Sequence, residues 1–216
     1  IFELNGNRII QKFEKEVGKS SVDIYPFVTL YTLDVICESA MGTSIKAQEN
    51  NNSNYVRSVQ AMCRIIIERS ISVLQMSDVT YFLTKNYYTQ KKSLNILHRQ
   101  TNSVIAKRRK ELENKKKETN AHDMVVTERK KAFLDLLLEA TVDGKPLTQE
   151  EIREEVDTFM FEGHDTTAAA ISFSLFSIAN HPDVQKRIYE EQHALFGENK
   201  NPVITYASLQ SMKYLE

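Results

Sequence analysis

The sequence predicts a mainly α-helical fold, on the evidence of its composition and of the spacing of its apolar residues. Of the 216 residues, 41% are hydrophobic and 26% are charged, whereas only 6 are Gly, 4 are Pro and none is Trp. An all-β protein rich in turns usually contains more Gly and Pro. Apolar residues recur mostly at the three- to four-residue spacing of helices, and no run alternates as a strand of comparable strength would.

The first two predicted helices are bounded by clear stop and start signals. Residues 7–17 precede Gly18, a typical helix stop, and carry apolar side chains at helical spacing: Ile9, Ile10, Phe13 and Val17. A second helix starts near Pro26, which suits a first turn, and continues to Met41. Because it is apolar on most sides, we expect it to be central.

The middle of the chain predicts two longer helices joined by an aromatic connector. Residues 48–54 are rich in Asn and predict a loop. Helical spacing resumes over residues 55–74 and again over 87–117, with the connector at 78–83. The second helix is basic, but Glu residues lie between its Lys and Arg residues, so we expect a solvated face rather than a patch for nucleic acid or membrane.

A mobile loop, a short helix and a turn are predicted next. The polar residues 119–127 predict the loop, and the Leu-rich run within 128–140 predicts the helix. Residues 142–146 contain Gly and Pro and predict the turn.

A capping box then predicts the start of the longest helix. Thr148 and Glu151 can satisfy free backbone donors at a helix start, and no Pro follows before Pro182. The helix can therefore extend over about 32 residues, or ~48 Å. Two further helices are expected, one at 183–195 and one beginning at 207–216.

Charge, cysteines and hydropathy exclude several classes of function. The 28 basic and 29 acidic residues give a net charge of -1, so nucleic acid is not an expected partner. Cys37 and Cys63 lie in apolar helical runs and are expected to be reduced core residues. No segment has the ~20 apolar residues needed to cross a bilayer. Because both ends look cut, at Ile1 and Glu216, we expect residues 1–216 to be one partial domain of a longer protein.

The long predicted helix contains a costly polar cluster within EVDTFMFEGHDTTAAA, residues 155–170. Burial of even a neutral polar group without a partner costs about 2–7 kcal/mol. At about 100° per residue, one face carries Phe159, Glu162, Gly163, Thr166 and Thr167. His164 and Asp165 point to the far side. Gly163 weakens the helix, so we expect something to approach the backbone closely there, and a flat cofactor fits.

Three interpretations of this cluster stay open on the residues alone. Thr hydroxyls can bond the carbonyl one turn back and admit water, which with Asp165 gives the parts of a proton relay. Alternatively, the cluster only fixes packing within a helical scaffold, pairing with basic residues of neighbouring helices. A third interpretation is a metal phosphohydrolase that uses the pairs His122-Asp123 and His164-Asp165 with His98.

At these residues the chain resembles the cytochrome P-450 monooxygenases. Residues 163–167, Gly-His-Asp-Thr-Thr, resemble the oxygen-binding motif of the long central helix of that family. Residues 155–167 resemble the signature of family 4, the fatty-acid hydroxylases, and most closely its insect members. The resemblance also includes residues 143–148, 181–185 and 209–216, and so covers the whole chain. It implies a P-450 fold from the helices before the substrate cover to the start of the Glu-x-x-Arg helix.

The resemblance implies a role for each residue of the cluster. Asp165 and Thr166 would be the acid and alcohol that deliver protons during oxygen activation. Glu162 and Gly163 would bind the heme, with Gly163 making room for oxygen and Glu162 forming the ester to a heme methyl group found in many family 4 members. Phe159 and Thr167 would line the substrate pocket.

The implied activity is that of a heme-thiolate monooxygenase. It would insert one atom of O2 into a long apolar substrate, such as a fatty acid, hormone or xenobiotic, with electrons from NADPH through a reductase and cytochrome b5 as a further partner. An N-terminal anchor absent from this chain would hold it on the cytoplasmic face of the endoplasmic reticulum membrane. The Cys ligand of the heme iron would lie beyond Glu216, so no metal ligand is assigned here and the chain alone is expected to be inactive.

Overall fold

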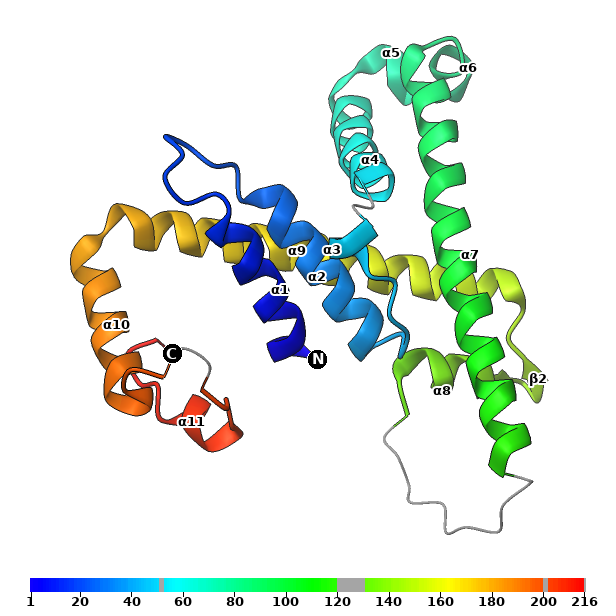
Figure 1. Cartoon of the computed structure of the whole chain (residues 1–216). Coiled ribbons are helices and arrows are strands. Elements are labelled where there is room, and N and C mark those ends of the chain that lie inside the picture. The colour runs from blue at the N-terminus through cyan, green and yellow to red at the C-terminus, as the bar shows by residue number, and fades with distance from the viewer. Residues whose placement is uncertain (51–52, 120–130, 200–201, 216) are drawn as a thin grey trace. The chain divides into compact units, whose positions relative to one another are not determined.

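A computed structural model of the chain describes residues 1–50, 53–119, 131–199 and 202–215, most of which are helical (Figure 1). The prediction of a mainly α fold is therefore confirmed. Contacts divide the chain into two compact units, Ile1–Thr167 and Ala168–Glu216. The boundary between them falls inside one continuous helix, and the single partial domain expected from the sequence stays a prediction.

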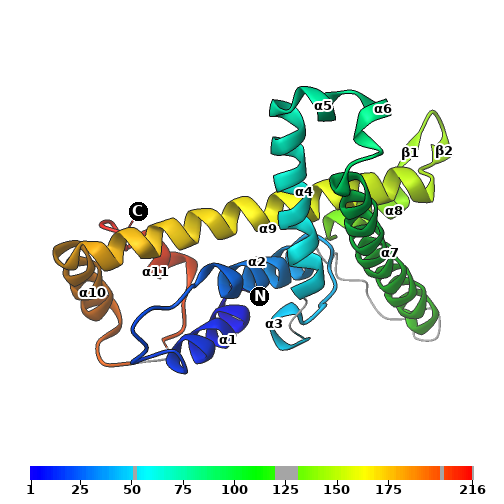
Figure 2. The same cartoon turned by 90° about the horizontal axis from the view of Figure 1, so that it is seen from above.

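The first unit contains eight helices within the described residues, a small hairpin and the first part of a ninth helix. In chain order these elements are α1 (Phe2–Glu14), α2 (Tyr25–Ser39), α3 (Ala47–Asn50), α4 (Ser53–Ile71), α5 (Val73–Met76), α6 (Asp78–Tyr81), α7 (Lys85–Thr119), α8 (Phe133–Glu139), β1 (Thr141–Val142), β2 (Lys145–Pro146) and α9 (Gln149–Asn180). Helices α4 and α7 pack side by side, and α5 and α6 join them (Figures 1 and 2).

The second helix is central to the first unit, as its apolar sequence predicts. Val28, Leu33 and Cys37 on α2 are 0% exposed. The main core around α2 combines side chains from α3, α4, α7, α8 and the first part of α9, among them Ala47, Val59, Ile105, Leu134 and Met160. Burial confirms Cys37 as a core residue and raises the pKa of its thiol, whereas Cys63 is only partly buried.

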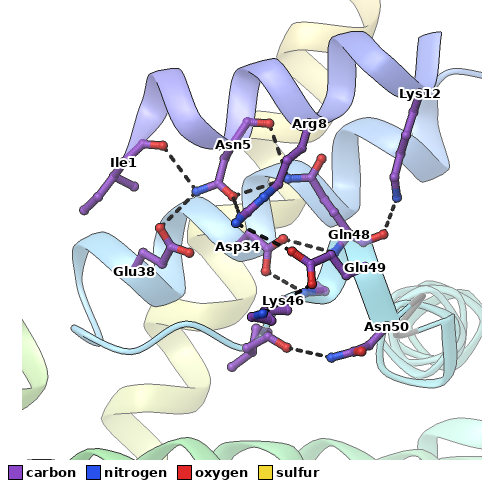
Figure 3. Close-up of polar contacts among 12 residues, drawn as sticks. Ile1, Asn5, Arg8, Lys12, Asp34, Glu38, Lys46, Gln48, Glu49 and Asn50 are labelled. Carbon is purple, nitrogen blue, oxygen red and sulfur yellow. Dashed lines mark hydrogen bonds and ion pairs between the residues drawn. The ribbon is translucent and has the colours of Figure 1, made fainter. Parts of the chain in front are cut away.

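Helix α3 overlaps the segment 48–54, which the sequence predicts to be a loop. Fully buried Asp34 of α2 accepts hydrogen bonds from the backbone N–H groups of Ala47 (2.6 Å) and Gln48 (3.0 Å). A carboxylate in this position caps a helix start. Figure 3 shows Asp34 within a polar network in which buried Asn5 of α1 also contacts Glu38. A partner distant in sequence thus produced a helical turn that local propensity did not predict.

The expectation that the cluster of Lys and Arg residues on the basic helix α7 is solvated is wrong at Arg108. Its side chain is buried and donates two hydrogen bonds to Asp135 of α8, at 2.7 and 2.8 Å, and one to the carbonyl of Gly42, at 2.6 Å. Bidentate pairing compensates the cost of burying both charges. The ion pair therefore fixes α7 against α8 and the segment after α2.

The predicted turn before the longest helix forms a two-stranded hairpin. Thr141 pairs with Pro146 and Val142 with Lys145. Asp143 and Gly144 connect the strands with φ of 51° and 75°. Two successive left-handed residues are typical of a tight hairpin turn, and Gly adopts this conformation at little cost.

Helix α9 begins and ends as the sequence predicts. The Glu151 N–H donates to the Thr148 hydroxyl at 3.2 Å, and the Thr148 N–H donates to the Glu151 carboxylate at 2.7 Å. This capping box starts a helix of 32 residues that stops before Pro182. Both the start and the length of the helix are confirmed.

The second unit contains α10 (Pro182–Phe196) and α11 (Tyr206–Gln210) after the end of α9. The predicted continuation of the last helix toward residue 216 is wrong, because α11 ends at Gln210 and turns follow. The carboxylate of Glu191 on α10 instead accepts the backbone N–H groups of Tyr214 (2.6 Å) and Leu215 (3.1 Å).

One predicted loop and the start of one predicted helix fall mostly outside the residues that the structure describes. The predicted loop at 119–127 and the first residues of the predicted helix at 128–140 fall almost entirely outside the described residues, and α8 itself spans only Phe133–Glu139. Among the residues that are described, no helix has both the length and the apolar character needed to span a bilayer.

Candidate functional site

The polar cluster lies at the middle of α9, where α2 packs against this helix. His164 is 0% exposed, and its Nδ1 lies 2.5 Å from the Met160 carbonyl oxygen, one turn back. The Tyr55 ring lies 5.6 Å from its imidazole ring, centroid to centroid. Burial lowers the pKa of His164, so the imidazole is neutral at physiological pH. His164 therefore belongs to the packed interior.

The Asp165 side chain points from α9 toward the start of α2. The Tyr25 hydroxyl donates a hydrogen bond of 2.8 Å to Asp165 Oδ1. Burial and this bond raise the pKa of Tyr25 to about 12, so the phenol keeps its proton and acts as the donor. The partner of Asp165 is thus a tyrosine, not one of the basic side chains that the packing interpretation requires.

Gly163 faces a different neighbour from the one that the sequence predicts. A Cβ atom at this position would lie 2.7 Å from Cδ1 and 2.8 Å from Cγ1 of Ile36 on α2. The close approach expected at this glycine is therefore made by Ile36, and a role for Gly163 in cofactor binding stays a prediction. Gly163 allows α2 and α9 to approach closely.

Glu162 and Thr166 lie on the open side of α9, one turn apart. Both side chains are exposed in the described part of the chain. The Thr166 hydroxyl donates a hydrogen bond of 2.6 Å to the Glu162 carbonyl oxygen. The predicted bond between a Thr hydroxyl and the carbonyl four residues back is therefore confirmed for Thr166.

A cleft of about 300 Å³ opens between α4, α7 and α9 beside Glu162. Its walls are mainly apolar and come from α4 (Val59, Met62, Cys63, Ile66), α7 (Leu94, Leu97) and α9 (Phe161); polar side chains line the rest (Tyr55, His98, Asp157, Thr158, Glu162). Its size and apolar lining are typical of pockets for small molecules. Glu162 thus belongs both to the polar cluster and to the cleft wall.

The two residues predicted to line a substrate pocket are not among those that line this cleft. The Phe159 ring stacks on Phe133 of α8, with centroids 3.8 Å apart and an interplanar angle of 26°, and is not among the residues that line the cleft. Thr167 is exposed and also lies outside the cleft lining. The aromatic residue that α9 contributes to the cleft is Phe161, which the helical projection had not selected.

Asp157 is a site residue that the sequence analysis missed. The Thr101 hydroxyl of α7 donates to Asp157 Oδ1, and His98 Nε2 lies 3.8 Å from its Oδ2. Asp157 therefore connects α9 to α7 at the cleft wall. Helix geometry could have identified Asp157, because it projects to the same side of the helix as His164. A carboxylate on a packed side needs a polar partner.

The metal interpretation finds no support in the residues that the structure describes. They contain no group of three or more His, Cys, Asp or Glu side chains that could hold a metal ion. His98 contacts Asp157, and His164 contacts a backbone carbonyl. His122 and Asp123 lie outside the described residues.

Comparisons with known proteins agree with the resemblance carried by the long helix. The model of the Cytochrome P450 family matches residues 1–216. Similar proteins include cytochrome P450 4d1 (41% identical; 43% of that protein covered) and 4c3 (42%; 42%) of Drosophila melanogaster and cytochrome P450 4V2 of Homo sapiens (43%; 42%), each matched over 100% of this chain. The chain thus spans about four-tenths of the length of these curated relatives. It belongs to the cytochrome P450 family.

Proposed function

We propose that the whole protein is a heme-thiolate monooxygenase that inserts one atom of O2 into a long apolar substrate, with electrons from NADPH delivered through a reductase. Family membership supports this class of reaction. The observation that carries the proposal is the position of Glu162, which lies on the cofactor motif and also lines the apolar cleft. A cofactor on this side of α9 and a substrate in the cleft would therefore meet.

The residues of this chain fit one side of a heme. Glu162 and Thr166 present a carboxylate and a hydroxyl on the exposed side of α9, where a flat group could lie. The heme would supply oxygen activation, and Glu162 would hold it through an ester. Neither cysteine suits the axial thiolate, because burial raises the pKa of both the Cys37 and the Cys63 thiol. We assign that ligand to a part of the protein outside this chain.

The protein's own proton carriers would be Asp165 and Thr166. The Asp165 carboxylate contacts Tyr25 on the α2 side, whereas the Thr166 hydroxyl contacts the Glu162 carbonyl on the open side. The side chains of Asp165 and Thr166 therefore point away from α9 in different directions. A change of the Asp165 side-chain rotamer, or an intervening water, would connect them.

The cleft lining favours an apolar substrate such as a fatty acid, a hormone or a xenobiotic. Phe161, rather than Phe159, is the aromatic side chain that would contact it. We further propose cytochrome b5 as a second electron donor and an anchor that holds the protein on the cytoplasmic face of the endoplasmic reticulum. The net charge of -1 supports the absence of nucleic acid from the set of partners.

An absorption spectrum tests the proposal directly. The full-length protein is reduced under carbon monoxide, and we expect a Soret band at the position typical of thiolate-ligated heme. Absence of that band from folded protein expressed with heme supplied would contradict the monooxygenase assignment and favour the scaffold interpretation.

The ester has its own test. In the full-length protein, we expect Glu162→Ala to leave heme extractable by acid and organic solvent, because the carboxylate that forms the bond is gone. Glu162→Asp is the matched control, because it keeps the carboxylate but shortens the side chain by one methylene group. The amount of heme retained by denatured protein is measured, and equal covalent heme in wild type and Glu162→Ala would refute the ester.

A further inference from the structure

The start of α2 contributes one side chain to the proton-carrying end of the motif. Tyr25 is the first residue of α2 and precedes Asp165 by 140 positions, yet its hydroxyl lies 2.8 Å from Asp165 Oδ1. Pro26 follows directly and fixes the backbone φ at this helix start. The position of the phenol is therefore set by a rigid part of the fold.

The groups around Asp165 make Tyr25 its main fixed contact in the described structure. The other titratable side chains whose pKa responds to the Asp165 charge are Tyr55 and Cys63 of α4 and His164 of α9. Burial raises the pKa of the Tyr55 phenol and of the Cys63 thiol and lowers the pKa of His164, so all three neighbours are uncharged near neutral pH. Asp165 is thus held by a neutral donor.

The lack of charge on the Tyr25 donor affects how firmly the Asp165 carboxylate is held. A phenol gives a carboxylate one hydrogen bond but no opposite charge, whereas Arg or Lys gives both. The Tyr25 bond can therefore fix the carboxylate in one rotamer and still release it without the cost of breaking a buried ion pair. Because the phenol has a raised pKa of about 12, it keeps its proton and is a holder rather than a proton source.

We propose that Tyr25 is a positioning residue for Asp165: its hydroxyl holds the carboxylate on the α2 side of α9 and sets how readily it turns toward Thr166. The role of Tyr25 in turnover rests on the proposed monooxygenase function. The contact between Tyr25 and Asp165 does not depend on that function. Proton delivery depends on this contact because it decides how often the acid and the alcohol can be connected.

The first experiment compares two phenol deletions on the same helix in the full-length heme protein. Tyr25→Phe removes the hydroxyl that contacts Asp165, and Tyr31→Phe removes one from another half-buried tyrosine of α2. Without the hydroxyl the Asp165 carboxylate is no longer held in one rotamer, so we expect product formed per NADPH consumed to fall roughly tenfold in Tyr25→Phe, the worth of one hydrogen bond to a charged group. The solvent deuterium isotope effect on product formation should change with it, whereas Tyr31→Phe should resemble wild type in both.

Two further measurements separate positioning from simple structural damage. The affinity for an apolar ligand, such as a long-chain alcohol, and the melting temperature should be alike in the two variants. Coupling and isotope effect in Tyr25→Phe equal to those in Tyr31→Phe would overturn the proposal. So would a loss of coupling that appears only together with a loss of ligand affinity.

The second experiment does not depend on turnover. Tyrosine is labelled with ¹³C in the ring, and the Tyr25 resonance is titrated by NMR in wild type and in Asp165→Asn. Because the Asp165 charge and hydrogen bond contribute to the raised pKa of about 12, we expect the variant value to move toward 10.0. An unchanged Tyr25 pKa would overturn the contact. A missing thiolate-heme band in wild type would instead refute the proposed function while leaving this titration intact.

Discussion

The two sides of α9 differ in burial, although both contribute residues to the same polar motif. On the α2 side, Val156, Met160 and His164 are all 0% exposed. On the other side, Glu162 and Thr166 are exposed within the same part of the helix. On the packed side, His164 Nδ1 contacts the Met160 backbone carbonyl, whereas Glu162 and Thr166 on the open side are accessible to solvent. A motif that looks like one unit in sequence therefore has one side packed in the interior and one side exposed.

The largest expected effect tests whether the packed side carries the stability. Met160→Ala leaves a cavity in the core and should lower the free energy of unfolding by about 3 kcal/mol. Glu162→Gln on the open side should change it by less than ~0.5 kcal/mol. Urea unfolding followed by circular dichroism measures both. Similar losses in the two variants would show that the two sides do not differ as described.

The next effect tests the close approach at Gly163. Gly163→Val places side-chain atoms where Ile36 lies, and overpacking of this kind costs about 2 kcal/mol. The double variant Gly163→Val with Ile36→Ala should lose less stability than the sum of the two single variants, because the second change removes the clashing atoms. Additive losses would place Gly163 away from Ile36 in solution.

A smaller effect concerns pH and the buried imidazole. Burial lowers the pKa of His164 below its usual value of 6.5, so the unfolded state binds the proton more tightly. The stabilisation is fully present above pH 6.5 and is lost as the pH falls toward the folded pKa, by about 1 kcal/mol per pH unit. His164→Leu should show a flatter stability profile below pH 6.5. Equal slopes in both proteins would argue against a neutral buried His164.

The smallest effect on stability is expected at Thr166. Thr166→Ala removes an exposed hydroxyl that bonds its own helix, so the free energy of unfolding should change by less than ~0.5 kcal/mol. In the full-length protein we expect apolar ligands to bind normally while more NADPH is spent on hydrogen peroxide. Thr166→Ser keeps the hydroxyl and should retain most of the coupling. Wild-type peroxide yield in Thr166→Ala would remove this residue from the proposed relay.

Much of the fold could be predicted because its signals are local. The capping box at Thr148 and the absence of Pro before Pro182 gave both ends of α9, and the apolar character of α2 gave its burial. Predictions that depended on distant partners were less accurate. Asp34 produced α3 from a predicted loop, and Asp135 drew Arg108 out of a predicted solvated face.

The candidate site shows the same division. The position of the polar cluster and the backbone bond of Thr166 depend on helix geometry and could be predicted. The neighbours of each side chain could not. A helical projection placed Phe159 and Gly163 beside Glu162, but Phe133 and Ile36 occupy the space around them. Phe161 was missed because a projection gives directions without saying which helices pack there.

The sequence by itself determined the helical class, the long helix with its polar motif, and a resemblance specific enough to indicate the family. Periodicity, caps and motif spacing are properties of neighbouring residues, so they can be read along the chain. Only the tertiary structure decided that His164 is buried, that Asp165 meets Tyr25 and that Glu162 lines a cleft. Burial and partner choice depend on which helices pack together, and that packing is set by the fold as a whole.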